Sequence, residues 1–400
     1  MMLGERYSPV LSKAREVLLG NVKVFNGYRV VVPHLKAYPV PYCWDTAFHV
    51  LGLVHVDPVL AKENIESLLL LMRDDGLIPN APLSAGNQDL RSQPPIIHFA
   101  VEYYLRRTGD RESVRRWFPR LKQYYRWWSR NGNLHGRAKR ALSPFTGARE
   151  GDPEKEFKLA YWAVCSTGMD NHPTYDVAEG RTVKVGDYYF VEVLDPFLTA
   201  SLAASARSMS IAAEELGLGD ERRFFESEHE ELSNVINELF WSSEDGFYYP
   251  LTWSLQPVRV KSVQAFTILY AGAADKGQAA KLVSHLTSEK EFWGQHGVPT
   301  AAFDDPKYMS EEPDWLYSFD PYYWSGPIWP PTTALAAIGL TNYSYRDLAI
   351  SVARKWLDLM ASSLNFAEYY YADGKPGITN RFNFGWTAAV TVFLGYFLAE

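Results

Sequence analysis

Apolar residues recur at intervals of three and four positions along most of the chain, the spacing of amphipathic helices. This pattern predicts about twelve helices, over residues 8–20, 44–54, 58–74, 94–107, 111–130, 192–216, 219–240, 261–271, 276–288, 328–339, 344–362 and 385–398. Alternating apolar residues predict a few short strands, within 28–33, 188–193 and 246–251. The joins between several helices are short and contain Gly, Asp, Asn or Pro, so consecutive helices should be antiparallel neighbours.

Helices paired in this way, in an even number and without a recognisable short repeat, predict an all-α closed barrel rather than a solenoid. No linker composition interrupts the chain, so we expect one domain over residues 1–400. Residues 137–184 lack a long periodic stretch and are predicted to be irregular. A loop of this length in a compact domain is usually functional, and this one contains STGMDNHPTYD.

The unusual sequence motifs occur just before every second predicted helix, and the joins at the other helix ends are short and plain. The motifs are YCWDTAF, SQPP, STGMDNHP, FDPYYWSGPIWPP and FAEYYYADGKPGITNRFNFGW. This asymmetry indicates an inner and an outer ring of helices, with the N-terminal ends of the inner helices converging on one face. A pocket there would combine aromatic rings with carboxylates and amides, which suits a sugar with apolar ring faces and a polar rim.

Composition removes several other classes of function. The net charge is −7 and no basic stripe is visible, which argues against a nucleic-acid partner. No apolar run is long enough for a membrane helix, and the N-terminus lacks a secretory signal, so a cytoplasmic location is expected. Two distant cysteines exclude a disulfide framework. Neither metal-ligand histidine spacing nor a phosphate-binding loop is present, so no metal or cofactor is expected.

A set of motifs in a fixed order makes the chain resemble glycoside hydrolase family 63. The resemblance is greatest to its short, single-domain members, such as mannosylglycerate and glucosylglycerate hydrolases and α-glucosidases. The motifs span nearly the whole chain: WDTAF at 44–48, GLIPN at 76–80, SQPP at 92–95, GMDN at 168–171, GVPT at 297–300, YWSGPIW at 323–329 and GWTAA at 385–389. The resemblance implies an (α/α)6 barrel and hydrolysis with inversion at the anomeric carbon.

The resemblance also implies roles for individual residues. Asp170 of GMDN would be the general acid and Glu368 the general base. Inverting enzymes hold two such carboxyl groups roughly 6.5–9.5 Å apart, which leaves room for the attacking water. The residues expected to bind the sugar are Tyr42, Trp44, Asp45, Gln93, Tyr323, Trp324, Trp329 and Trp386.

Several of these residues also have a purely structural interpretation. Asp45 and Gln93 could cap helices, Asp170 lies in a sequence typical of turns, and Glu368 could be a solvated partner of Arg381. Two other positions depart from the family pattern. His172 stands where serine is expected, and Ser325 stands where arginine is expected, which leaves the leaving group open.

The function expected from the sequence is an inverting, exo-acting α-glycosidase acting on a small α-glucoside or α-mannoside. The leaving group could be glycerate, a second sugar or an oligosaccharide end. The alternatives are a sugar epimerase or isomerase on the same fold, a glycoside phosphorylase, and a helical scaffold without activity. The first would need a histidine base and the second a cluster of phosphate-binding cations, and neither is evident.

Overall fold

The computed structural model describes residues 3–82, 90–147, 156–316 and 320–397, and most of them are helical. Six helices form an inner ring: α2 (Cys43–Leu53), α4 (Ile97–Thr108), α7 (Pro196–Glu215), α9 (Phe266–Ala271), α11 (Pro330–Asn342) and α13 (Gly385–Phe397). Each of them packs against the next in chain order, and α13 packs against α2, so the ring is closed. The expected all-α (α/α)6 barrel is therefore confirmed.

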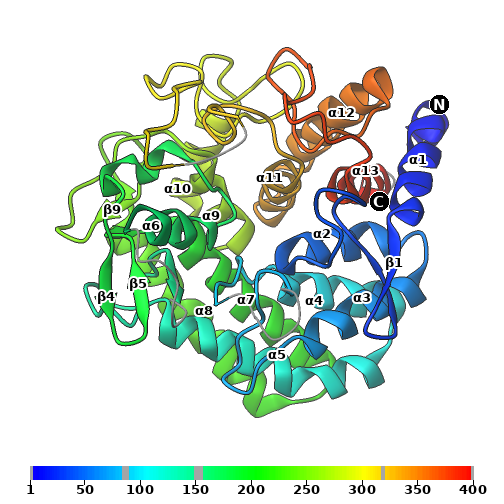
Figure 1. Cartoon of the computed structure of the whole chain (residues 1–400), viewed down its shortest axis with the longest axis horizontal. Coiled ribbons are helices and arrows are strands. Elements are labelled where there is room, and N and C mark those ends of the chain that lie inside the picture. Colours follow the sequence, from blue (N-terminus) through cyan, green and yellow to red (C-terminus); the bar gives the residue numbers. More distant parts are fainter. Residues whose placement is uncertain (1–2, 83–89, 148–155, 317–319, 398–400) are drawn as a thin grey trace.

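Six further helices alternate with these along the chain and form the outer layer. They are α1 (Leu3–Gly20), α3 (Pro58–Leu70), α5 (Arg111–Asn131), α8 (Gly219–Leu239), α10 (Lys276–Leu286) and α12 (Arg346–Ser363). Figure 1 shows the chain making one circuit, and the first and last helices, α1 and α13, pack together where it ends. No helix in the described part of the chain is long and apolar enough to cross a membrane.

The difference between the two layers follows from residue type. Every residue of α2 and of α9 is buried, whereas α8 buries only Phe225, Leu232, Val235 and Ile236. Inner helices must pack on both neighbours and on the outer layer, so they need small or apolar residues all round. Glycines allow the closest approaches: a Cβ on Gly52 would lie 2.6 Å from the carbonyl oxygen of Ala389, and one on Gly339 would lie 2.8 Å from the Tyr270 nitrogen.

Aspartates begin several helices by accepting hydrogen bonds from backbone N–H groups of the first turn, as N-caps do. Asp57 caps α3, Asp110 caps α5, Asp195 caps α7, and Asp275 forms a capping box with Gln278 at α10. The Asp195 cap shifts the start of α7 to residue 196 rather than the predicted 192.

The strands are short and lie outside the helical ring. They are β1 (Val22–Phe25) with β2 (Tyr28–Val31), β3 (Phe145–Gly147) with β5 (Tyr188–Phe190) and β4 (Val183–Val185), β6 (Val193–Leu194) with β9 (Leu251–Thr252), and β7 (Trp241–Ser242) with β8 (Phe247–Tyr248). Each predicted strand region contains at least one of them. Two 3₁₀-helices complete the described elements, η1 (Pro173–Ala178) and η2 (Val263–Ala265).

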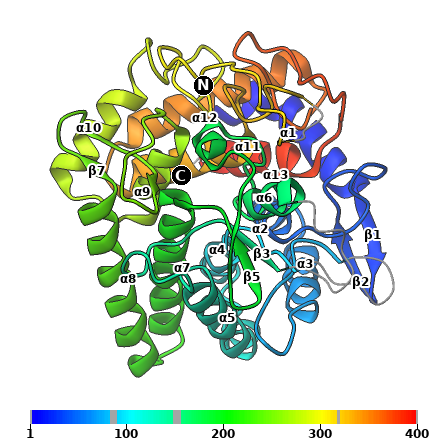
Figure 2. The ribbon, with the colours of Figure 1, turned by 60° about the vertical axis from the view of Figure 1, so that its left-hand side comes forward.

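The prediction that residues 137–184 are irregular was wrong, although residues 148–155 lie outside the described part. The segment contains β3, η1, β4 and a further helix, α6 (Glu156–Cys165). Residues Leu159, Ala160, Ala163, Val164 and Cys165 of α6 are all buried. A helix without a polar face has no one-sided apolar periodicity, which is why the pattern did not reveal it. Figure 2 shows α6 beside β3 and β5, which it contacts.

We predict that Gly52→Ala lowers the free energy of unfolding by about 1–3 kcal/mol, the usual cost of forcing extra volume into a packed core. The added methyl would meet the backbone of α13, which cannot rotate away as a side chain could. Thermal and denaturant unfolding measure the effect. The control is Gly20→Ala at the end of α1, where an added Cβ meets nothing within 4 Å. Equal stability of the two variants would contradict the close packing of α2 on α13.

Candidate active site

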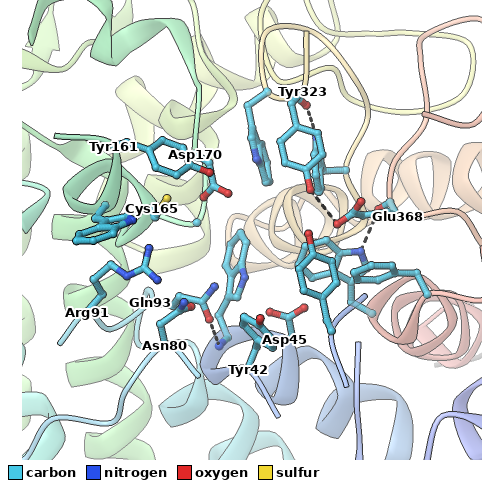
Figure 3. A pocket seen from close by; sticks show the side chains of 18 residues that line it. Tyr42, Asp45, Asn80, Arg91, Gln93, Tyr161, Cys165, Asp170, Tyr323 and Glu368 are labelled. Carbon is cyan, nitrogen blue, oxygen red and sulfur yellow. Dashed lines mark hydrogen bonds between the residues drawn. The ribbon is translucent and has the colours of Figure 1, made fainter. Parts of the chain in front are cut away.

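A cavity of about 300 Å³ lies at the N-terminal ends of the inner helices (Figure 3). All ten residues expected at a site from the sequence line it: Tyr42, Trp44, Asp45, Gln93, Asp170, Tyr323, Trp324, Trp329, Glu368 and Trp386. These residues come from five separate stretches of the chain. Closure of the ring is what brings the first of them, in α2, beside the last, in α13.

The start of α2 supplies one wall of the cavity. Trp44 and Asp45 lie in its first turn and are almost fully buried. Asp45 does not cap this helix, because the N-cap position is Tyr42. Gln93 does act as a cap, but of α2 rather than of the helix that follows it, since its Oε1 accepts a hydrogen bond from the Trp44 backbone N–H at 3.1 Å. Gln93 therefore both lines the cavity and fixes the beginning of α2.

The aromatic wall is held rigidly by stacking and by hydrogen bonds. Trp324 and Trp329 stack with ring centroids 3.8 Å apart and planes inclined by 6°. Trp386 stands perpendicular to Trp44, with centroids 5.8 Å apart, and its Nε1 donates to the Glu368 carbonyl oxygen at 3.0 Å. Among the described residues the Trp324 Nε1–H has no acceptor, although the side chain is buried.

Gly168 determines how Asp170 reaches the cavity. Its φ of +74° is in the left-handed region, which favours glycine, and a Cβ there would lie 2.6 Å from the Trp44 ring. The turn after α6 can therefore press against Trp44 and present Asp170. Burial and the charge of Glu368 raise the pKa of Asp170, whereas the nearby Arg91 guanidinium and a hydrogen bond with the Cys165 thiol lower it. The net result is a pKa of about 7.

Glu368 has a different environment from Asp170, because it is surrounded by donors. Its Oε1 accepts from the Tyr323 hydroxyl at 2.8 Å, and its Oε2 accepts from Arg381 Nη1 at 2.8 Å and from the Thr379 hydroxyl at 3.2 Å. Burial raises the pKa of Glu368, whereas the charge of Arg381 and these hydrogen bonds lower it. The interpretation of Glu368 as a solvated carboxylate is wrong, since only 2% of it is exposed.

A third carboxyl group shares the cavity. Burial raises the pKa of Asp45 well above its ordinary value, and the charges of Glu368 and Asp170 raise it further. Like charges in one buried pocket disfavour each other, so ionisation of Glu368 makes ionisation of Asp45 and Asp170 harder.

Sequence reasoning missed eight residues that line the cavity: Tyr38, Asn80, Arg91, Tyr161, Trp162, Cys165, Gly168 and Phe384. Asn80, Gly168 and Arg91 lie in or next to the motifs GLIPN, GMDN and SQPP, so those motifs could have indicated them. Tyr161, Trp162 and Cys165 come from α6, the helix that the apolar pattern concealed.

The two residues that depart from the family pattern are both buried and do not line the cavity. Ser325 donates a hydrogen bond to the Ser310 carbonyl oxygen at 3.0 Å. His172 contacts Thr174, Ser262 and Thr300 through its ring nitrogens, and burial lowers its pKa to about 4. Both are therefore parts of the supporting loops.

Asp320 is a further buried carboxylate, outside the cavity lining. It accepts hydrogen bonds from the hydroxyls of Tyr369 and Tyr371. Within residues 3–82, 90–147, 156–316 and 320–397, no three His, Cys, Asp or Glu side chains are grouped so that they could hold a metal ion.

Known proteins similar to this chain are glycoside hydrolases. Residues 38–387 match the model of the mannosylglycerate hydrolase MGH1-like glycoside hydrolase domain. The mannosylglycerate hydrolase of Thermus thermophilus is 25% identical, over 95% of this chain and 99% of its own length. The trehalase of Oryctolagus cuniculus is 22% identical, over 98% of this chain and 71% of its own.

A solved structure has the same fold. The glucose complex of a mannosylglycerate hydrolase from Thermus thermophilus superposes with a TM-score of 0.77 at 22% identity, covering 96% of this chain and 99% of that one. The match to the family model extends over most of the chain and includes every residue that lines the cavity. The chain belongs to the mannosylglycerate hydrolase MGH1-like family and is a glycoside hydrolase.

Proposed function

We propose that the protein is an inverting, exo-acting α-glycosidase that hydrolyses a small α-glucoside or α-mannoside, with Asp170 as general acid and Glu368 as general base. The observation that carries the proposal is the contrast between two carboxyl groups across one cavity. Figure 3 draws them on facing sides, Asp170 near Tyr161 and Glu368 near Tyr323. One environment favours the protonated form and the other is rich in donors to the ionised form.

The general acid must hold a proton near neutral pH and release it to the leaving oxygen. Asp170 satisfies this condition because its pKa is raised to about 7. A general acid works best when its pKa is close to the working pH. Arg91 keeps this pKa from rising further, so the proton can still be given up.

The general base must be ionised and oriented toward a water molecule. Arg381 and Tyr323 both donate to the Glu368 carboxylate and hold its plane in one orientation. The raised pKa of Glu368 makes it a stronger proton acceptor than an exposed carboxylate. The same arginine keeps it charged, and both properties are needed in a base.

In this mechanism, two proton transfers accompany a single displacement at the anomeric carbon. Glu368 takes a proton from water while the water oxygen attacks the anomeric carbon from the face opposite the leaving group. The glycosidic bond breaks, and Asp170 gives its proton to the departing oxygen. An α-linked substrate thereby yields a β-sugar. Exchange with solvent then returns a proton to Asp170 and removes one from Glu368.

The shape of the cavity supports a small substrate bound by its end. A volume of about 300 Å³ is at the lower limit of small-molecule sites, which span roughly 300–1,000 Å³. The rings of Trp44, Trp324 and Trp386 line the cavity and can pack against a sugar ring, whereas Trp329 is stacked between Trp324 and Tyr369 and supports them from behind. The Asp45 carboxyl, whose pKa is raised by burial, lies in the same cavity and can form a hydrogen bond with a sugar hydroxyl.

The leaving group should lie on the side of Asp170, because the proton is delivered there. Figure 3 shows Arg91, Cys165 and Tyr161 on that side. A guanidinium at this position favours a leaving group with a carboxylate over a neutral sugar. Relatives include mannosylglycerate hydrolases and trehalases, and one relative's structure holds D-glycerate, so we propose an acidic leaving group such as glycerate.

We propose one catalytic domain over the whole chain, since the lining residues extend from Tyr38 to Trp386. The expected cytoplasmic location and the expected absence of a cofactor stay predictions.

We predict that Asp170→Asn and Glu368→Gln each lower kcat by about 100- to 10,000-fold, the usual contribution of one proton transfer. Purified variants are assayed on α-mannosylglycerate, α-glucosylglycerate and trehalose. Proton NMR before mutarotation identifies the anomer released by the wild type, which should be β. The glycerates should be hydrolysed faster than trehalose.

Asp373→Asn is the matched control for these variants, because this carboxylate lies five residues from Glu368 but pairs with Lys375 at the surface. Its kcat should equal that of the wild type. Release of the α-anomer, or near-normal activity of Glu368→Gln in a folded protein, would exclude the proposed pair. Asp45 would then be the next candidate, because it is the third carboxyl group in the cavity.

The pH profile of kcat/KM should be bell-shaped. Activity should fall as the pH rises through about 7, because Asp170 then loses its proton, and fall in acid as Glu368 gains one. Arg91→Met removes a charge that lowers the Asp170 pKa, so the alkaline limb should move to higher pH. Arg381→Met should move the acid limb to higher pH, because Glu368 loses the cation that favours its ionised form.

The charge-preserving variant Arg381→Lys should leave the acid limb closer to its original position. If Arg91→Met instead moved the acid limb, the roles of Asp170 and Glu368 would have to be exchanged. Limbs that stay in place in both methionine variants would show that neither carboxyl group controls the rate.

A further inference from the structure

A second cavity, of about 220 Å³, lies toward the opposite ends of the inner helices. Its walls come from α4, α7, α11, α13 and the first residue of α12. Phe99, Tyr103, Ile211, Ile338 and Phe393 form apolar walls. It is smaller than the roughly 300–1,000 Å³ of sites for drug-sized ligands, so an occupant would be small.

Three arginines and one carboxylate line this cavity: Arg106, Arg207, Arg346 and Glu102. Glu102 is 3% exposed, and its carboxylate pairs with Arg106 at 3.0 Å and accepts from the Ser208 hydroxyl at 2.9 Å. One arginine is therefore neutralised by the one acid. The other two leave the cavity with an excess of two positive charges.

Neither of the two remaining guanidinium groups forms an ion pair with a carboxylate in the described part of the chain. Arg207 is half-buried, and its guanidinium takes part in no ion pair or hydrogen bond there. Arg346 is exposed and lies over the Phe397 ring, 6.0 Å from its centroid. Partly burying an arginine without a counter-ion costs free energy, so such a side chain usually meets an anion.

Arg207 would have a structural role if its guanidinium donated hydrogen bonds to the carbonyl oxygens at the end of α9. It lies near that end, 3.6 Å from the position of a Cβ on Gly272. The carbonyl oxygens there are, however, already paired. The acceptors at residues 268–271 are reached by Ala273 N, Gly272 N, the Asn342 side-chain amide and His229 Nε2. Arg207 is therefore not needed to complete this helix end.

We propose that this cavity is a binding site for a small organic anion, with a carboxylate or phosphate group held by Arg207 and Arg346 and an apolar body lying against Phe99 and Phe393. Arginine suits this task because its planar fork of N–H donors matches the oxygens of both groups. Glu102 acts on Arg207 only at longer range because its ion pair is with Arg106, so the anion would supply a direct partner for Arg207. The apolar walls select a compact organic body over a bare inorganic ion.

The site is separate from the catalytic cavity. Helices α4, α11 and α13 each follow a segment that lines the catalytic cavity at their N-terminal ends, and they line the second cavity toward their C-terminal ends. On α13 the second cavity is lined by Phe393 and Phe397, seven and eleven residues beyond Trp386, which is about 10–17 Å at a helical rise of about 1.5 Å per residue. Binding at the second cavity can therefore be measured without reference to the reaction.

The test is isothermal titration calorimetry of the whole chain with benzoate, phenyl phosphate and benzamide. Benzoate or phenyl phosphate should bind, and comparing the two shows which head group the site prefers. Benzamide has nearly the same shape as benzoate but no charge, and should not bind. Arg207→Met and Arg346→Met keep the apolar stems and should each weaken anion binding about ten- to a hundredfold, the usual effect of losing a charged hydrogen bond.

Two control variants locate the binding. Arg354→Met, two turns further along α12 and exposed, should bind the anion as the wild type does. Arg91→Met removes a cation from the catalytic cavity and should also leave the affinity unchanged. If Arg207→Met does not fold, the exposed Arg346→Met decides the question alone.

The proposal is wrong if neither anion binds, if benzamide binds as tightly as benzoate, or if both Arg207→Met and Arg346→Met keep the wild-type affinity. Loss of binding in Arg91→Met, with Arg207→Met unaffected, would place the anion in the catalytic cavity instead. That last result would leave the proposed glycosidase function intact, so the failures of the two proposals can be told apart.

Discussion

The packing of α13 against α2 is the contact on which the catalytic cavity depends. It joins the last inner helix to the first and closes the ring. The contact is possible because Gly52 leaves room for the backbone at Ala389. Closure sets Trp386 against Trp44, and Trp386 in turn holds the Glu368 backbone. Closure therefore places the Glu368 segment beside the start of α2, so that both ends of the chain line one cavity.

Once the ring is closed, the differences between the carboxyl groups arise from their neighbours. Asp170, Glu368 and Asp45 share one dry cavity, so each makes ionisation of the others harder. Arg381 donates directly to Glu368 and favours its charged form. Burial also raises the pKa of Asp170, and the groups that lower it, Arg91 and the Cys165 thiol, leave it near 7. In the proposed mechanism, one low-dielectric pocket would thus provide both an acid and a base.

The two ends of the inner helices lie beside cavities with different side chains. Their N-terminal ends follow long loops that contribute aromatic rings and carboxyl groups. Toward their C-terminal ends, arginines outnumber acids around the second cavity. The charge of each cavity therefore depends on loop and helix-end residues, while the small and apolar residues along the helices make the shared framework.

The sequence alone determined the fold class and most of the catalytic cavity. Apolar spacing indicated twelve of the helices, because a helix with a polar face repeats its apolar residues every three to four positions. The motifs that precede or open alternate helices, together with the family resemblance that they carry, indicated ten of the residues that line the cavity. The same reasoning missed α6, which has no polar face, and with it Tyr161, Trp162 and Cys165.

Only the tertiary structure decided what depends on distance between remote parts of the chain. The sequence could not show that Gln93 caps α2, that Arg381 binds Glu368, or that Ser325 points away from the cavity. It also could not show which arginines lack partners, because pairing depends on groups brought together by the ring. Local residue patterns reflect the contacts within one helix or turn, whereas pKa values and cavities arise from the sum of contacts across the whole fold.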